Sequence, residues 1–186
     1  MSKKALKGFC GARVWPVSVN NSTTYTTGEM VSLSAAQNLT KEVTGNEYTI
    51  YADDGVYDSG EDFQYEDLTF TVAELPLEIE AQLSGGTYSE TDKTYTFKNT
   101  DTAPEYAFGY AALQVDGNYR MFKHYVVKLT KVGVEHATRG DNNDIAAYEL
   151  TFRGTQRAAD GAVRIMKDSE DKTYSWLNTI DNLPSA

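Results

Sequence analysis

Alternation of apolar and polar residues predicts that this chain is built mainly from β-strands. Residues 67–75 alternate well, with Leu68, Phe70 and Val72 on one face and Asp67, Thr69 and Thr71 on the other, which is the period of a half-buried strand. Residues 145–157 show the same alternation. Residues 105–115 and 119–131 flank an Asp-Gly-Asn turn, and this combination predicts a β-hairpin.

Further strands are predicted from less regular patterns. Residues 11–19 indicate a strand in which Pro16 requires an edge or a bulge. Residues 39–54 form a long extended stretch, and residues 162–166 follow a turn. The segments that complete the chain are a polar loop at residues 20–30 and, at residues 173–180, either a short helix or a last strand.

One helix is expected between residues 75 and 86. Pro76 suits its first turn, and Gly85 or Gly86 can close it in a left-handed cap. Apolar residues recur every four positions, as Leu75, Ile79 and Leu83. A helix this short depends on packing against a sheet.

Together these elements predict a mainly β fold, an antiparallel β-sandwich or partial barrel with one flanking α-helix. The sequence contains no internal repeat and no linker that would divide it. We therefore expect a single domain over residues 1–186, which is long enough to bury a core.

The charge balance narrows the classes of function. The chain has 27 acidic and 17 basic residues, a net charge of −10, and such a surface repels nucleic acids and anionic lipids. No stretch approaches the ~20 apolar residues of a membrane span. The basic N-terminus has no apolar run after it, so we expect no secretion signal and synthesis in a cytoplasm.

The acidic residues concentrate in residues 51–67, where seven carboxylates occur without a Lys or Arg. We expect an exposed polar loop between two strands. No register of this segment satisfies an EF-hand, which needs Gly at its sixth and Glu at its twelfth position. Clustering alone establishes no acid–base pair, so neither a metal site nor a catalytic site is predicted here.

Other candidate chemistry is sparse. Cys10 is the only cysteine and is expected to be a small buried hydrophobic residue. His124 is expected to be a hydrogen-bonded structural histidine and His136 a surface one. No phosphate-binding glycine motif occurs. We therefore expect a protein that is not an enzyme and has no cofactor.

Four segments together resemble one known family. They are KGFCGARVWPV, the long run YADDGVYDSGEDFQYEDLTFTVAELPLEIEAQL, PEYAFGYAALQVDGNYRMFKHYVVKLTKVG and AYELTFRGTQRAADG. Their order resembles the major tail tube proteins of long, flexible-tailed bacteriophages, over roughly Gly8 to Ile180. The most specific parts are YADD with the strand and LPLEIEAQL after it, and YAFGYAAL with its hairpin partner.

The resemblance implies a structural protein of the virion tail with a tail tube fold. Members of the family form hexameric rings that stack into a hollow tube around a tape-measure protein, and DNA passes through the tube without specific binding. The resemblance also implies a tail terminator and a distal tail protein as partners, assembly in the cytoplasm of a host bacterium, and no membrane partner.

For the acidic segment we weigh three roles: a contact loop reaching another subunit or ring, a part of the lumen, and a solvated outer loop. We favour the contact loop, which basic residues of a neighbour would meet; Lys3, Lys4, Lys7, Arg139 and Arg157 are the candidates. The residues assigned to this contact are Tyr51, Asp53, Asp54, Tyr57, Asp58, Glu61, Asp62 and Phe63.

Two polar strand faces are candidates for the wall of a lumen that we expect to be electronegative, the alternative being an ordinary solvent-facing sheet surface. They carry Asp67, Thr69, Thr71, Glu149 and Thr151. Arg153 shares the second face, and we expect Glu149 to neutralise it. Parts of residues 20–30 and 53–63 are expected to stay mobile until neighbouring subunits order them.

Two other classes of protein fit the same composition. A carbohydrate- or receptor-binding β-sandwich would present a concave aromatic patch and remain a monomer or small oligomer. A hydrolase with a jelly-roll core would place two carboxylates in one cleft and raise the pKa of one of them.

Overall fold

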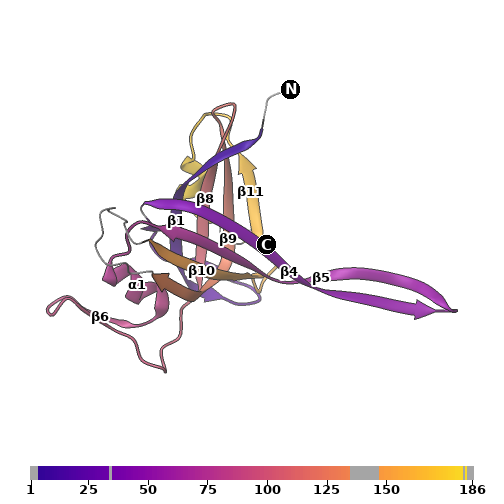
Figure 1. Cartoon of the computed structure of the whole chain (residues 1–186), viewed down its shortest axis with the longest axis horizontal. Helices are drawn as coiled ribbons and strands as arrows, with labels where there is room; N and C mark the ends of the chain where they lie inside the picture. The colour runs from indigo at the N-terminus through magenta and orange to yellow at the C-terminus, as the bar shows by residue number, and fades with distance from the viewer. Residues whose placement is uncertain (1–3, 34, 135–146, 182, 184–186) are drawn as a thin grey trace, which may run out of the picture.

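The computed structural model describes residues 4–33, 35–134, 147–181 and 183, which form a curved antiparallel sheet with one α-helix at its flank (Figure 1). The elements of the described chain are β1 (Leu6–Asn20), β2 (Tyr25–Thr27), β3 (Val31–Ser32), β4 (Ala36–Ala52), β5 (Gly55–Val72), α1 (Leu77–Ser84), β6 (Thr87–Ser89), β7 (Thr94–Thr96), β8 (Tyr106–Gln114), β9 (Tyr119–Val134), β10 (Tyr148–Thr155), β11 (Arg164–Asp168) and the 3₁₀-helix η1 (Ser175–Asn178).

The main sheet follows the order β2-β1-β8-β9-β10-β5-β4, with every neighbouring pair antiparallel. The long strand β9 pairs with β11 along its first half and with β10 along its second half. β1 and β4 lie near opposite ends of this order and also contact each other, so the sheet curls toward closure. The predicted fold class, an antiparallel sandwich or partial barrel with one flanking α-helix, is confirmed.

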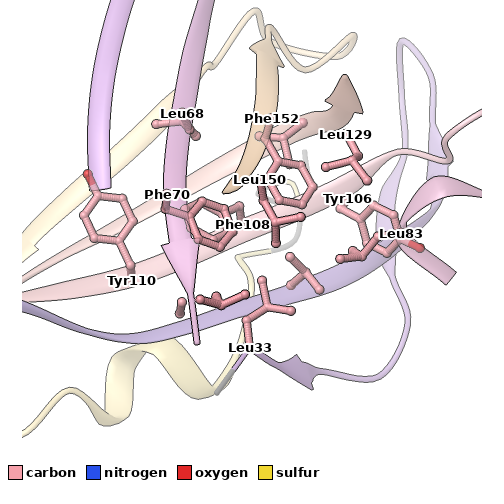
Figure 2. Close-up of a cluster of buried hydrophobic side chains, with 14 of the residues drawn as sticks. Leu33, Leu68, Phe70, Leu83, Tyr106, Phe108, Tyr110, Leu129, Leu150 and Phe152 are labelled. Carbon is pink, nitrogen blue, oxygen red and sulfur yellow. The ribbon is translucent and has the colours of Figure 1, made fainter. Parts of the chain in front are cut away.

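The centre of the core is a stack of three phenylalanine rings from three strands (Figure 2). Phe70 of β5, Phe108 of β8 and Phe152 of β10 are fully buried, with ring centroids 5.2 to 5.8 Å apart. The alternation in β5 and β10 places these rings inward and the polar residues between them outward, as the sequence predicts.

The helix α1 lies where the sequence predicts it, and its C-terminus depends on a glycine. Gly85 caps α1 in the left-handed conformation, with φ +81°. A Cβ at this position would lie 2.2 Å from the carbonyl oxygen of Thr102, so no other residue fits without a backbone shift. Leu83 carries the apolar side of the helix into the core.

Residues 20–30 differ from the expected polar loop, because they contain β2 and a buried tyrosine. Tyr25 is 1% exposed, and its hydroxyl donates a hydrogen bond to the carbonyl oxygen of Tyr125. The guanidinium of Arg157 lies over both rings, at 5.1 Å from the centroid of Tyr25 and 4.0 Å from that of Tyr125. Aromatic packing against a cation therefore fixes a segment whose sequence contains few apolar residues.

The C-terminal segment resolves the choice between a helix and a strand. Residues 175–178 form η1, and Leu177 within it is fully buried. Arg13 holds this turn by donating hydrogen bonds to Asn178 and to the carbonyl oxygen of Leu177. The sequence GDNND at residues 140–144 also predicts a turn, and these residues lie outside the described part of the chain.

The stacked rings predict a steep cost for opening the core. Replacing Phe70 with Ala removes ring contacts to Phe108 and Phe152 and leaves a cavity, so we expect the free energy of unfolding to fall by about 3–5 kcal/mol. Urea unfolding followed by fluorescence measures this change. The matched control is Phe97→Ala, at a 57% exposed ring, which should change stability by less than about 0.5 kcal/mol. Equal losses in the two variants would contradict this view of the core.

Candidate functional site

The acidic segment is not a loop but part of a long β-hairpin. β4 and β5 pair from Ala36 opposite Val72 out to Ala52 opposite Gly55. Asp53 and Asp54 make the two-residue turn, both with positive φ (49° and 64°), as a tight hairpin turn requires. The carboxylates reduce strand propensity, but backbone pairing with β4 and the interspersed Tyr, Val and Phe side chains compensate for this.

The outer half of this hairpin extends into solvent. The pairing of β5 with β10 ends at Glu66, opposite Gly154, and beyond that residue β5 pairs only with β4. Figure 1 shows this part projecting from one end of the body. We call residues 44–65 the hairpin arm. Two strands without a covering layer are marginally stable in water.

Large apolar side chains on and beside the arm are exposed. Tyr51 and Tyr57 beside the turn are 74% and 77% exposed. The remaining exposed apolar residues of this hairpin are Val43, Tyr48, Ile50, Val56 and Phe63. Apolar side chains gathered on one projecting element are typical of a surface that another molecule covers.

The carboxylates of the arm have no cationic partner within the described part of the chain. The ion pairs of that part involve none of the predicted contact residues. Glu47 and Glu61 lie directly opposite each other across the two strands, an arrangement that destabilises a hairpin by repulsion. The arm therefore lacks compensating positive charge of its own.

The arm belongs to a longer stretch without a base. Between Lys41 and Lys93 the sequence has 14 acidic residues and neither Lys nor Arg. The rest of the chain has 17 bases and 13 acids. Charge is thus divided between an acidic arm with its adjoining segments and a slightly basic remainder.

Two of the bases proposed to meet the arm are engaged within their own chain. Arg157 is 3% exposed and pairs with Asp160, so it is not available to a neighbour and that expectation is wrong. Lys4 pairs with Asp168 at 2.9 Å, although its side chain remains exposed, as does Lys7. Lys3 and Arg139 lie outside the described residues.

The predicted polar face is brought together by the pairing of β5 with β10. Asp67 lies opposite Arg153, Thr69 opposite Thr151, and Thr71 opposite Glu149. The two hydroxyls of the central pair are 3.2 Å apart. Thr71 continues the face to β4, where its hydroxyl donates to Asn38 over 3.1 Å.

The ion pairs on this face differ from those expected. Arg153 donates two hydrogen bonds, of 2.9 and 3.0 Å, to the carboxylate of Asp67, because residues directly opposite on paired strands are closer than residues two apart on one strand. Glu149 instead accepts a 2.8 Å bond from Lys131 of β9. The hydrogen bonds to Asp67 raise the pKa of Arg153. Each carboxylate is thus matched by a cation, and the face is rich in hydroxyls rather than electronegative.

A buried ion cluster at the base of the arm was missed in the sequence. Glu66 and His124 are both fully buried, and Glu66 bonds to His124 and to Arg164. The available signal was the strand period, because Glu66 stands in register with the inward-facing Leu68 and Phe70. An acid at an apolar-facing position requires a buried partner.

The histidines and the cysteine are the remaining candidates for chemistry. His124 is only partly satisfied, since its Nε2 has no hydrogen-bond partner; His136 lies outside the described residues. Cys10 is partly rather than fully buried, and burial raises the pKa of its thiol. In the described residues no group of three His, Cys, Asp or Glu side chains is arranged to hold a metal ion. Among the helices there, none has the length and apolar character to cross a membrane.

The fold is similar to proteins of contractile injection systems. One similar structure is the sheath-tube complex of an extracellular contractile injection system called PVC, in the extended state, with 11% identity, a TM-score of 0.46 and coverage of 84% of this chain and 88% of that one. A second is the tube-terminating cap of the anti-feeding prophage, with 10% identity, a TM-score of 0.43 and coverage of 85% and 88%. A third is the PVC sheath/tube terminator in the extended state. It has 13% identity, a TM-score of 0.42 and coverage of 83% of this chain and 92% of that one.

No family model and no curated protein matches the sequence. The similarities to solved structures are distant, with TM-scores below 0.5. The function is therefore argued from the chain's own surfaces.

The opposed glutamates predict that one substitution will stabilise the arm. Glu61→Lys replaces a repulsive pair with an attractive pair, for which we expect a local gain of about 0.2–1 kcal/mol. Hydrogen exchange should show slower exchange at amides of residues 46–50 and 58–62. The control Glu78→Lys on α1 changes net charge equally without touching the arm. Equal protection of the arm in the two variants would show that cross-strand repulsion is unimportant.

Proposed function

We propose that this chain is a structural subunit of a tail tube and acts through contacts between its own copies. The observation that carries the proposal is the hairpin arm, with exposed aromatic rings and carboxylates that find no partner in the described part of the chain. Binding would break no ion pair of such an arm within the described part of the chain. It would remove the exposed apolar side chains of the arm from water, which is favourable.

A second copy is the partner that the charges favour. The arm holds acids and no base, whereas the remainder of the chain has an excess of bases. The β4 strand of the arm spans residues 44–52 and the β5 strand residues 55–65. At about 3.3 Å per residue, the shorter strand lets the arm reach roughly 30 Å beyond the body. That length allows contact with a subunit of the next ring rather than only with the nearest neighbour.

Open strand edges supply the contact within a ring. β4 ends the strand order, and its outer edge is available over much of its 17 residues. Exposed edges readily pair with another strand, and a closed ring removes them by pairing each subunit with the next. The hexameric number of subunits is an expectation from the family resemblance, as are the tape-measure, terminator and distal tail partners.

The polar face of β5 and β10 is the candidate lumen wall. Arg153 and Lys131, the cations that could retain DNA phosphates, are each bound to a carboxylate. Threonine hydroxyls occupy the positions between them. A wall of this composition offers phosphates no unpaired cation, so DNA passes without specific binding. The assembled location is then the virion tail, after assembly in a bacterial cytoplasm.

A second candidate function is carbohydrate binding, which a hollow beside α1 favours. It has a volume of about 570 Å³, and its lining includes Tyr95, Phe97 and Leu129. Aromatic rings beside polar groups are the features that sugar sites use. This candidate predicts a chain that stays monomeric and whose melting temperature rises with a sugar.

The tube proposal is tested by removing charge from the turn. In the triple variant Asp53→Asn, Asp54→Asn, Asp58→Asn, we expect the concentration needed for assembly to rise about tenfold, equivalent to 1.4 kcal/mol per contact, with a weaker dependence on salt. Electron microscopy and light scattering of purified protein measure both.

The control is Glu78→Gln, Glu90→Gln, Asp92→Asn, which removes three acids outside the arm and should assemble like the wild-type chain. Assembly with unchanged salt sensitivity in the first variant would refute the contact. A chain that stays solitary at high concentration and binds duplex DNA tightly would refute the tube.

A further inference from the structure

Glu66 marks the point on β5 where the hairpin arm leaves the body. This is the last residue of β5 that pairs with β10, opposite Gly154, and on its other side it pairs with Val43 of β4. Any change in the direction of the arm must therefore pass through the backbone around Glu66. Its side chain points into the body, where it is fully buried.

The carboxylate of Glu66 ties three strands together. His124 of β9 donates from Nδ1 to one oxygen, and Arg164 of β11 donates from Nη1 to the other. His124 and Arg164 are themselves opposite each other in the pairing of β9 with β11. Gly154 leaves the space for this arrangement, since a Cβ there would lie 2.9 Å from Cγ of Glu66.

The net charge of this cluster is zero only while His124 is neutral. One carboxylate and one guanidinium then offset each other, and the neutral imidazole donates its single proton to Glu66. Its other nitrogen, Nε2, is buried without a partner among the described residues, and the ring packs beside Phe108 and Tyr110 of β8, at centroid distances of 6.2 and 6.0 Å. A second proton on Nε2 would have no acceptor among the described residues, and burial penalises the added charge.

Charged and titratable groups face His124 from each neighbouring strand except β10, which contributes Gly154. They are Glu66 on β5, Arg164 on β11, Lys41 on β4 and Tyr110 on β8. Burial is the largest cause that lowers the pKa of His124, and the cations Arg164 and Lys41 lower it further. Glu66 acts in the opposite direction. The bonds from His124 and Arg164 hold the pKa of Glu66 below its ordinary value despite burial.

We propose that Glu66, His124 and Arg164 form a joint that fixes the direction of the hairpin arm at neutral pH and releases it when His124 is protonated in acid. Protonation puts a second positive charge beside Arg164 at a fully buried imidazole, and the charge is relieved when the contact between Glu66 and His124 opens and solvent reaches the imidazole. The joint is a property of the free chain and does not depend on what the arm contacts.

The sign of the pH dependence follows from the lowered pKa. The closed joint favours neutral His124, so its stabilising contribution is complete above the ordinary histidine pKa of about 6.5. The contribution is lost as the pH falls toward the lowered pKa of the closed state. Over that interval the open fraction rises about tenfold for each pH unit, because opening takes up one proton.

The test measures the position of the arm in the monomer. Cys10 is replaced with Ser, and spin labels are attached through Ser59→Cys on the arm and Lys7→Cys on β1, both exposed positions. Distances between the labels are recorded from pH 7.5 downward at a concentration where light scattering shows monomers. We expect one narrow distribution at neutral pH and a second, broad population that grows tenfold per pH unit in acid.

Two histidine variants make the test specific. His124→Asn keeps a donor toward Glu66 but cannot titrate, so its distribution should stay narrow; His136→Asn removes the other histidine and should behave as the wild type. Near-ultraviolet circular dichroism monitors the core in parallel. The proposal is overturned if the arm broadens equally in His124→Asn, if it never broadens, or if it broadens only as the core signal is lost.

Discussion

The continuous pairing of β4 with β5 is the constraint on which the rest of the molecule depends. The inner end of β5 is held by the phenylalanine stack and by β10, and the inner end of β4 by its pairing with β5 and by Leu39 packed on the core, whereas the outer ends have only each other. Backbone hydrogen bonds carry the order of the core outward along the same two strands. The arm is therefore an extension of the sheet. Its direction is determined around Glu66, where β5 stops pairing with β10 and continues into solvent with β4 alone.

The acidic residues of the body and those of the arm differ in whether they form ion pairs. On the body, two acids of the polar face are bonded to bases, Asp67 to Arg153 and Glu149 to Lys131. On the arm, acids lie opposite acids or neutral residues, as Glu47 lies opposite Glu61. Exposed ion pairs contribute little to stability, so the pairing on the body matters chiefly because it removes free cations from a surface. The missing pairing on the arm leaves charge that only another molecule can neutralise.

The sequence predicts the parts of this fold that local rules determine. Alternation of apolar and polar residues correctly predicted the core-facing part of β5 and the strand β10, with Asp67 and Glu149 on their polar faces. Gly85 correctly predicted the end of α1. The arm was misread as a loop because its carboxylates mask the strand pattern, and only the register with β4 reveals it. Which base meets which acid depends on cross-strand neighbours, so the partner of Arg153 could not be read from β10 alone.

The acidity of the arm also limits how it can associate. A long exposed strand pair with aromatic side chains is an aggregation hazard, and charged side chains are the usual protection against it. Two arms brought together would each present carboxylates to the other, which disfavours a symmetric contact between them. A contact between the arm and a different, more basic surface of another copy has no such penalty. Contacts of that head-to-tail kind repeat from copy to copy and build rings or filaments rather than closed pairs, so under the proposed function the charge that protects the free chain would also select a head-to-tail geometry of assembly.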